Sequence, residues 1–404
     1  MDPHRRIEAI WRMEAARLIA SLSRLTRDVG TAEEIAQDVF VAALEQWPSG
    51  GVPPNPAGWL HTTGRHKAID RIRRDRMRDE RQLSAALDPT VPDGSDDDLL
   101  ALIFTACHPV LTREARTALT LRLLGGLSTD EIAHAFLAPS PTIGQRISRA
   151  KRTLAEAKVP FAPPHGDELR ERLPAVLEVI YLIFTEGYAA TSGDAWIRRD
   201  LAEEAMRLGR MLTGLLPREP EPYGLVALME LQASRFRARI APDGSPVLLQ
   251  DQDRSRWDRT LIQHGLAALD RATALARPLG PYSVQAAIAA VHARAPRFEE
   301  TDWEAIVALY DALGQIAPSP VVALNRAVAV LHADGPAAAL AAIDEVRADP
   351  RMARHHLVGA VRGDVLLRLG RAAEAAEEWE RAADLAPNQR ESRLLRERAA
   401  RALT

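Results

Sequence analysis

The chain has 404 residues, of which 47% are hydrophobic and 26% charged, a balance typical of a globular protein with several domains. Its formal net charge of −3 excludes nucleic-acid binding by overall positive charge, so any such site must be a local basic patch. The single cysteine, Cys107, excludes an intrachain disulfide, and no apolar run is long enough to span a bilayer, so we expect a cytoplasmic protein.

Two amphipathic helices are expected first, over residues 7–25 and 32–47, with Thr31 as the cap of the second. The second helix has apolar residues on one face and a mostly acidic outer face. That outer face consists of Glu33, Glu34, Gln37, Asp38 and Glu45. An acidic face is usually only solvated, and the alternative is contact with a partner protein.

A basic helix is expected next. Residues 48–56 are rich in proline and glycine and should break the preceding helix, and Asn55 and Pro56 should start the new one. From residue 65 to residue 78 there are seven basic residues and two acids, which favours contact with phosphates. The local charge then changes from positive to negative, because residues 79–98 contain seven acids and one base. We expect this stretch to be an extended acidic linker.

A helix-turn-helix pattern follows over residues 123–154. Ser128 and Glu131 have the spacing of a capping box at the start of its first helix. Ser140 is expected to cap the second helix, with Pro141 at its first position. The second helix has one apolar face and one basic face, as expected of a helix that enters the major groove of DNA. An ordinary hairpin with a solvated basic face is the alternative.

Three blocks of the first 160 residues, in this order and spacing, resemble bacterial RNA polymerase sigma factors of the extracytoplasmic-function type. The blocks are AEEIAQDVFVAALEQW, NPAGWLHTTGRHKAIDRIRR and LSTDEIAHAFLAPSPTIGQRISRAKRTL. Such proteins are minimal sigma factors that keep the second and fourth sigma domains. The resemblance implies, in turn, a helix that binds core RNA polymerase, a helix that reads the −10 promoter element and a helix-turn-helix that reads the −35 element.

The resemblance also assigns residues to these roles. Those that bind core polymerase are Glu34, Gln37 and Asp38. Those at the −10 element are Arg65, His66, Lys67, Asp70, Arg73 and Arg74. Those at the −35 element are Ser140, Thr142, Gln145, Arg146, Arg149, Lys151 and Arg152. His66 stands where the family usually has asparagine, and Pro141 and Gly144 are unusual in a recognition helix, so the promoter bases do not follow from the sequence.

The remaining residues carry further helical patterns. The positions of a tetratricopeptide repeat are matched in spacing by Gly363, Ala375, Trp379, Ala382 and Pro387. Gly370 falls at the turn of this unit, and residues 323–350 look like a degenerate unit before it. Blocks such as EVIYLIFTEGYAA and DQDRSRWD resemble a sub-group of these sigma factors with a long helical, tetratricopeptide-bearing C-terminal extension.

We therefore predict an all-α protein with two small sigma-type domains and a helical, tetratricopeptide-like extension. The expected divisions are domain 2 (1–78), the acidic linker (79–98), domain 4 (99–160), the helical extension (161–300) and the repeats (301–404). Within the extension, residues 251–258 combine charge with arginine and tryptophan, the types enriched at interface hot spots. We expect a regulatory interface made by Asp253, Arg254, Arg256 and Trp257. The alternative is a self-capping loop in which Asp258 starts the next helix.

The predicted function is that of a sigma factor, with the extension modulating its activity. The expected partners are promoter DNA, the β and β′ subunits of core RNA polymerase, and a protein partner or intramolecular contact through the repeats, with no membrane contact. The alternative is a stand-alone helix-turn-helix regulator with a helical-repeat sensor. We expect no enzymatic activity, bound cofactor or metal site. The histidines lack metal-ligand spacing, no glycine-rich phosphate loop is present, and Cys107 is expected to be a packed thiol.

Overall fold

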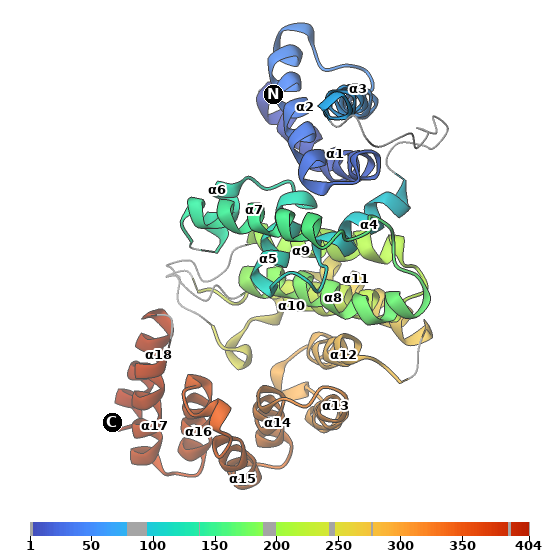
Figure 1. Ribbon diagram of the computed structural model, residues 1–404. Coiled ribbons are helices and arrows are strands. Elements are labelled where there is room, and N and C mark those ends of the chain that lie inside the picture. Colours follow the sequence, from blue (N-terminus) through green and yellow to red (C-terminus); the bar gives the residue numbers. More distant parts are fainter. Residues whose placement is uncertain are drawn as a thin grey trace. The chain divides into compact units, whose positions relative to one another are not determined.

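The structure is a computed structural model that describes residues 3–78, 95–136, 138–188, 199–241, 247–275, 278–386 and 389–403. These residues form helices and no β-strand, which confirms the all-α prediction (Figure 1). The chain divides into two compact units, residues 1–183 and 184–404. Helix α8 (Gly166–Tyr188) begins in the first unit and ends in the second.

The first three helices pack against one another. They are α1 (Pro3–Thr26), α2 (Val29–Gly50) and α3 (Pro56–Arg78). Aromatic pairs join them: Trp11 stacks on Phe40 with ring centroids 4.7 Å apart, and Trp47 meets Trp59 edge to face at 5.2 Å. Gly64 lets α3 approach α1 closely, because a Cβ there would lie 3.0 Å from a methyl group of Leu18.

The caps of these helices differ in part from expectation. Helix α2 begins at Val29 because the side chain of Asp28 accepts a hydrogen bond from the Thr31 amide, so the prediction that Thr31 is the cap was wrong. The same helix continues past Pro48 to Gly50, later than predicted, and ends at Gly51 with φ +81°. Helix α3 starts as predicted, since the Asn55 side chain accepts a hydrogen bond from the Gly58 amide.

The first unit continues with five further helices. They are α4 (Asp96–Ala106), α5 (Arg113–Leu123), α6 (Thr129–Ala135), α7 (Ser140–Glu156) and the start of α8. Residues 96–98, expected to be linker, instead form the first turn of α4, which Ser95 caps. The rest of the predicted linker, 79–94, lies outside the described residues. The start of α8 contacts α4, because Arg172 donates a hydrogen bond to the Phe104 carbonyl oxygen at 2.9 Å.

The second unit begins with helices that pack around α10. They are α9 (Arg199–Leu215), α10 (Pro220–Ala233), α11 (Arg259–Leu275) and α12 (Pro281–Arg294), with the 3₁₀ turns η1 (Leu249–Asp251) and η2 (Arg254–Arg256) between α10 and α11. Two glycines allow close packing on α10. A Cβ at Gly224 would lie 2.7 Å from the Ser283 amide nitrogen, and one at Gly265 would lie 2.8 Å from Leu231.

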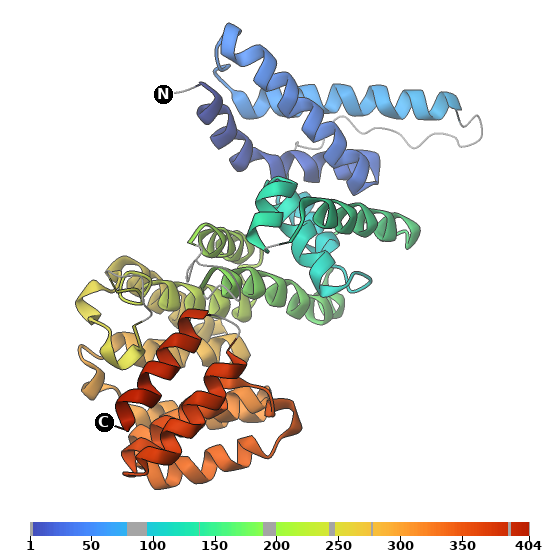
Figure 2. The same cartoon turned by 90° about the vertical axis from the view of Figure 1, so that its left-hand side faces the viewer.

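In the last part of the chain each helix packs against the next (Figure 2). The elements are η3 (Phe298–Glu300), α13 (Trp303–Ile316), α14 (Pro320–Ala333), α15 (Pro336–Arg347), η4 (Pro350–Met352), α16 (His356–Arg368), α17 (Ala372–Leu385) and α18 (Gln389–Ala402). Gly370 lies at the turn between α16 and α17, as expected, and Gly335 lies at the turn between α14 and α15; both have positive φ. Gly363 lies directly against the Trp379 indole. Pro387 is outside the described residues, and the tetratricopeptide assignment stays a prediction.

Candidate nucleic-acid interface

The helix-turn-helix is formed by α6 and α7. The capping box at its start is confirmed, because the Glu131 amide donates to the Ser128 hydroxyl at 3.1 Å and the Ser128 amide donates to the Glu131 carboxylate at 2.7 Å. Helix α7 begins one residue earlier than predicted, with Pro139 at the cap position. Ser140 is its first residue and makes no capping bond, so that part of the prediction was wrong.

The two faces of α7 differ as the sequence predicted. Its apolar residues Ile143 and Ile147 are buried, since 0% and 5% of their surface is exposed. The side chains exposed on the opposite face include Thr142, Gln145, Arg149 and Arg152. Arg146 and Ser140 are partly buried. Free hydrogen-bonding side chains near the start of a helix are what direct readout of base edges requires.

Helix α3 places the six residues assigned to the −10 element along one helix. His66, Asp70, Arg73 and Arg74 are exposed, and Arg65 and Lys67 are partly exposed. On the same helix Gly64 and Ala68 are buried. Arg74 also donates a hydrogen bond to the Asp70 carbonyl oxygen at 3.3 Å. The basic side chains of α3 are therefore open to solvent, where phosphates could reach them.

Helix α2 presents the residues assigned to core polymerase. Glu34 and Asp38 are exposed and Gln37 is partly exposed, whereas Ile35 and Val39 are buried. Glu34 lies 3.9 Å from Arg71 of α3, and its side chain is 64% exposed. Because an exposed ion pair at this distance contributes little, the acidic face remains available to a partner.

Glu33 was predicted to lie on the acidic outer face of α2, and this was wrong. Its side chain is only 6% exposed and makes ion pairs with Lys151 of α7 and with Arg122 of α5, the latter at 2.7 Å. Burial alone raises the pKa of Glu33, but the two cations and their hydrogen bonds outweigh it and lower the pKa. Lys151, assigned from the sequence to DNA, is therefore engaged by Glu33 in this arrangement.

Further ion pairs join the first three helices to the helices that follow. Arg17 pairs with Asp96 at 2.9 Å, and Arg24 pairs at 3.1 Å with Asp98, whose side chain is 7% exposed. Arg12 also reaches Glu131 of the capping box at 2.8 Å. We use the name inter-domain contact for these pairs together with the Glu33 cluster. Sequence reasoning missed this contact because its partners lie at least 74 residues apart in the chain, the separation of Arg24 and Asp98.

The segment of residues 251–258 is partly a structural loop. Arg254 is buried and donates hydrogen bonds to the carbonyl oxygens of His292 and Ala295 and to the Thr301 hydroxyl, at 2.7–3.0 Å. Trp257 is 3% exposed. Asp258 accepts hydrogen bonds from the first amides of α11, as the self-capping alternative required. Of the residues assigned to a regulatory interface, Asp253 and Arg256 are the exposed ones.

Among the described residues there is neither a reactive thiol nor a cluster of metal ligands. Cys107 is a packed thiol, as predicted: it is 2% exposed, and burial raises its pKa to about 11, so it is not a thiolate near neutral pH. Among the described residues, no group of three or more histidine, cysteine or acidic side chains could hold a metal ion. None of the described helices is long and apolar enough to cross a membrane.

An exposed basic helix followed by a helix-turn-helix with a free polar face defines a class of DNA-binding protein with two reading elements. Family comparisons agree with this class. Residues 10–78 match sigma-70 region 2, and residues 101–154 match sigma-70 region 4. Residues 172–273 match a family of unknown function, DUF6596.

Relatives cover both the whole chain and its first part. The uncharacterized protein R00370 of Rhizobium meliloti (strain 1021) is 44% identical over 389 residues, which are 94% of this chain and 91% of that protein. The ECF RNA polymerase sigma factor SigK of Mycobacterium sp. (strain KMS) is 28% identical over 156 residues, 36% of this chain and 79% of that protein. SigK of Mycobacterium tuberculosis (strain CDC 1551 / Oshkosh) is 28% identical over 152 residues, 34% and 78% of the two chains.

The chain belongs to the extracytoplasmic-function sigma factors of the sigma-70 family, in a form with a long helical C-terminal extension. It is therefore a promoter-directing factor for transcription initiation, and sigma factors as a class are non-enzymatic. The alternative of a stand-alone regulator is not favoured, since an operator-binding protein has no need of sigma-70 region 2.

Proposed function

We propose that this sigma factor binds core RNA polymerase through the exposed face of α2, reads the −10 element with α3 and reads the −35 element with α7. The observation that carries this proposal is the exposed polar face of α7, opposite the buried Ile143 and Ile147. Gln145 and Arg149 lie four residues apart, hence on one face of the helix. Each can make bidentate contacts with base edges, worth about 1–3 kcal/mol of discrimination per pair.

The solvent-exposed basic residues of α3 support the second part of the proposal. Arg73 and Arg74 are exposed and suited to phosphates, which would give binding a strong dependence on salt. His66 is exposed on the same helix, at the position where the family usually has asparagine. Opening the −10 element requires a base held outside the stack, at a cost of a few kcal/mol. His66 has a flat ring that can contact such a base.

The acidic face of α2 supports the third part. Glu34, Gln37 and Asp38 project from a helix whose other face is fixed by buried apolar residues, so the face is rigid. The partner would be the β′ subunit, with the β subunit contacting the region-4 helices, and the protein would act in the cytoplasm. The extension would modulate this activity through the repeats, either by contact with the sigma domains or by holding another protein.

A pulldown of the full-length chain with purified core RNA polymerase tests the first step. Asp38→Lys should reduce the amount of core polymerase retained several-fold, because it reverses an exposed charge on the proposed face. Glu8→Lys is the matched control, since Glu8 is an exposed acid on α1. Both variants should melt as the parent does, because surface changes usually cost less than about 0.5 kcal/mol. Equal retention of both variants would exclude this face as the binding surface.

A further inference from the structure

Helix α4 of domain 4 is buried on every side. Each residue from Leu99 to Ala106 is at most 7% exposed, and apart from Thr105 all of them are apolar. A helix that is apolar all round needs neighbours all round. Helices α1 and α5 pack against α4, and the start of α8 contacts it as well. The match to sigma-70 region 4, however, ends at residue 154, before α8 begins.

Polar bonds join the start of α8 to α4 and α5. Arg172 of α8 donates its hydrogen bond to the Phe104 carbonyl oxygen at 2.9 Å, and its guanidinium lies 5.5 Å from the centre of the Phe104 ring. Phe104 is in the last turn of α4, where carbonyl groups lack an amide partner in their own helix and attract a cation. Further along α8, Glu178 makes an ion pair at 3.1 Å with Arg113, the first residue of α5. The start of α8 therefore bridges the end of α4 and the beginning of α5.

Apolar side chains of α8 are buried in the same stretch. Leu173, Val176, Leu177 and Ile180 are each at most 6% exposed, and their spacing of three or four residues places them on one face of the helix. The first compact unit extends to residue 183. Up to that residue, α8 therefore packs as part of the unit that contains the sigma domains.

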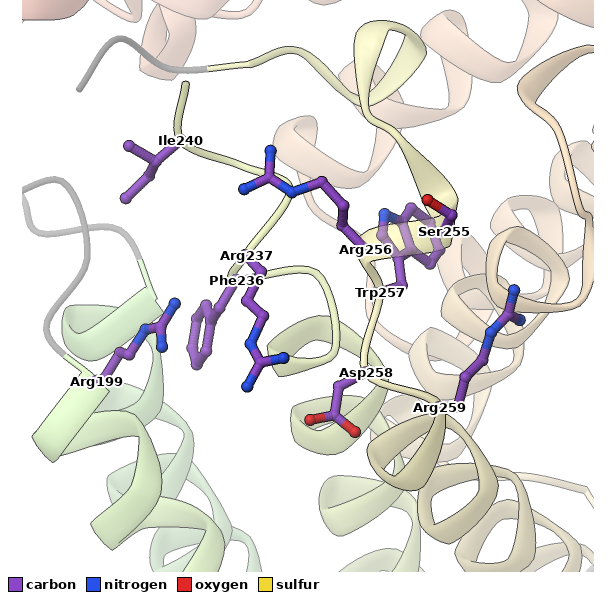
Figure 3. A pocket seen from close by; sticks show the side chains of 9 residues that line it. All are labelled: Arg199, Phe236, Arg237, Ile240, Ser255, Arg256, Trp257, Asp258 and Arg259. Carbon is purple, nitrogen blue, oxygen red and sulfur yellow. The ribbon is translucent and has the colours of Figure 1, made fainter. Parts of the chain in front are cut away.

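Arg172 also differs from exposed arginines of the extension. Its side chain is only 11% exposed. Figure 3 shows Arg237 and Arg256 beside a hollow of the second unit, and both of these residues are exposed. Arginine is seldom buried unless its charge is paired and its donors are bound. The burial of Arg172 therefore indicates a lasting contact between α8 and α4.

We propose that the first half of α8 is a working part of the −35-reading domain, held on α4 and α5 as a partner helix that the extension of the same chain supplies. Loss of α8 would expose apolar side chains of α4 to water and would remove the ion-pair partner of Arg113. Helix α5 packs against both α4 and α7, so this loss would also reach the recognition helix. The functional half of the proposal rests on the assignment of −35 reading to α7, whereas the contact itself does not.

Cleavage of the full-length chain between α7 and α8 tests the contact. A specific protease site is inserted at Ala162, an exposed residue of this connection, and the folded protein is cut. We expect residues 1–162 and 163–404 to elute together in gel filtration, because α8 holds them. Arg172→Ala combined with Glu178→Arg should weaken their association at least about tenfold, since a hydrogen bond from a charged group contributes on that scale. Separation of the parent fragments would overturn the proposal.

Matched controls show whether the loss is specific. Arg170→Ala combined with Glu171→Arg makes the same two changes at exposed positions of α8, and Arg256→Ala removes an exposed guanidinium elsewhere in the extension. The fragments of both control proteins should associate as those of the parent do. If the controls weaken the association as much as the substitutions at Arg172 and Glu178, the contact of α8 with α4 and α5 does not hold the fragments together.

Transcription reconstituted with core polymerase on two templates that differ only in the −35 element tests the functional half. The cut parent should keep the ratio of transcripts that the uncut parent gives. The cut variant of Arg172 and Glu178, at a concentration where its fragments separate, should lose most of this ratio. An unchanged ratio after separation would refute the role of α8. If the uncut parent does not distinguish the templates, the assignment of −35 reading to α7 fails, and the association measurement alone decides the contact.

Discussion

Replacement of Glu33 by glutamine should loosen the inter-domain contact. The substitution keeps the shape of the side chain but leaves Arg122 and Lys151 facing a neutral amide. Removing one partner of a fully buried ion pair costs about 3–5 kcal/mol. The side chains of Arg122 and Lys151 are 18% and 19% exposed, so water can solvate them in part. We therefore expect a smaller cost, about 2–3 kcal/mol for opening the contact.

Hydrogen exchange of the full-length chain measures this opening. A cost of about 2–3 kcal/mol corresponds to about 30- to 150-fold faster exchange of those amides of α5 and α7 that exchange by separation of the contact. Glu34→Gln is the matched control, because Glu34 is the next residue of α2 and its side chain is 64% exposed. It should change exchange less than about twofold. Similar exchange in the two variants would mean that the buried ion pairs do not hold the contact together.

Three further outcomes are expected. In transcription reconstituted with core polymerase, Arg149→Ala should lower the amount of transcript to an extent that depends on the −35 sequence. An equal loss on all −35 sequences, with a shallower salt dependence of promoter binding, would instead show that Arg149 contacts only phosphate. Arg254→Ala should lower the melting temperature of the extension, because it removes three hydrogen bonds from a buried site, whereas Arg256→Ala should leave it unchanged; equal effects would contradict this. Burial, with Arg368 nearby, lowers the pKa of His332 to about 4. Below about pH 6.5 the unfolded chain therefore binds a proton at this residue that the folded chain does not. The free energy of unfolding should then fall as the pH is lowered from about 6.5 to about 4. His332→Gln should reduce this fall, as measured by thermal melts over that pH range.

The sequence predicted those features that depend on residues close together in the chain. The capping box of Ser128 and Glu131 and the Asn55 cap follow from spacings of three residues, and both are present. The buried face of α7 follows from helical periodicity. Competing local signals explain the errors. Asp28 and Thr31 are both good caps, and the aspartate starts α2 one turn earlier than the threonine would.

Features that depend on distant residues could not be predicted in this way. Glu33 has the same local pattern as Glu34, yet one is buried and the other is exposed. The difference arises from Arg122 and Lys151, which are 89 and 118 residues away. Arg254 likewise looked like an interface residue, because arginine and tryptophan are frequent at hot spots, but the carbonyl groups that bind it belong to the end of α12 and the residue after it.

The inter-domain contact sets a limit on how much DNA the protein can span. Elements named −35 and −10 are about 25 base pairs apart, which is about 85 Å at 3.4 Å per base pair of B-form DNA. While Lys151 stays bound to Glu33, however, α7 remains in direct contact with α2 and cannot move along the DNA away from it. A footprint of the free protein should therefore cover a single element. A footprint of both elements requires separation of the contact, and binding to polymerase would have to supply the free energy for that separation.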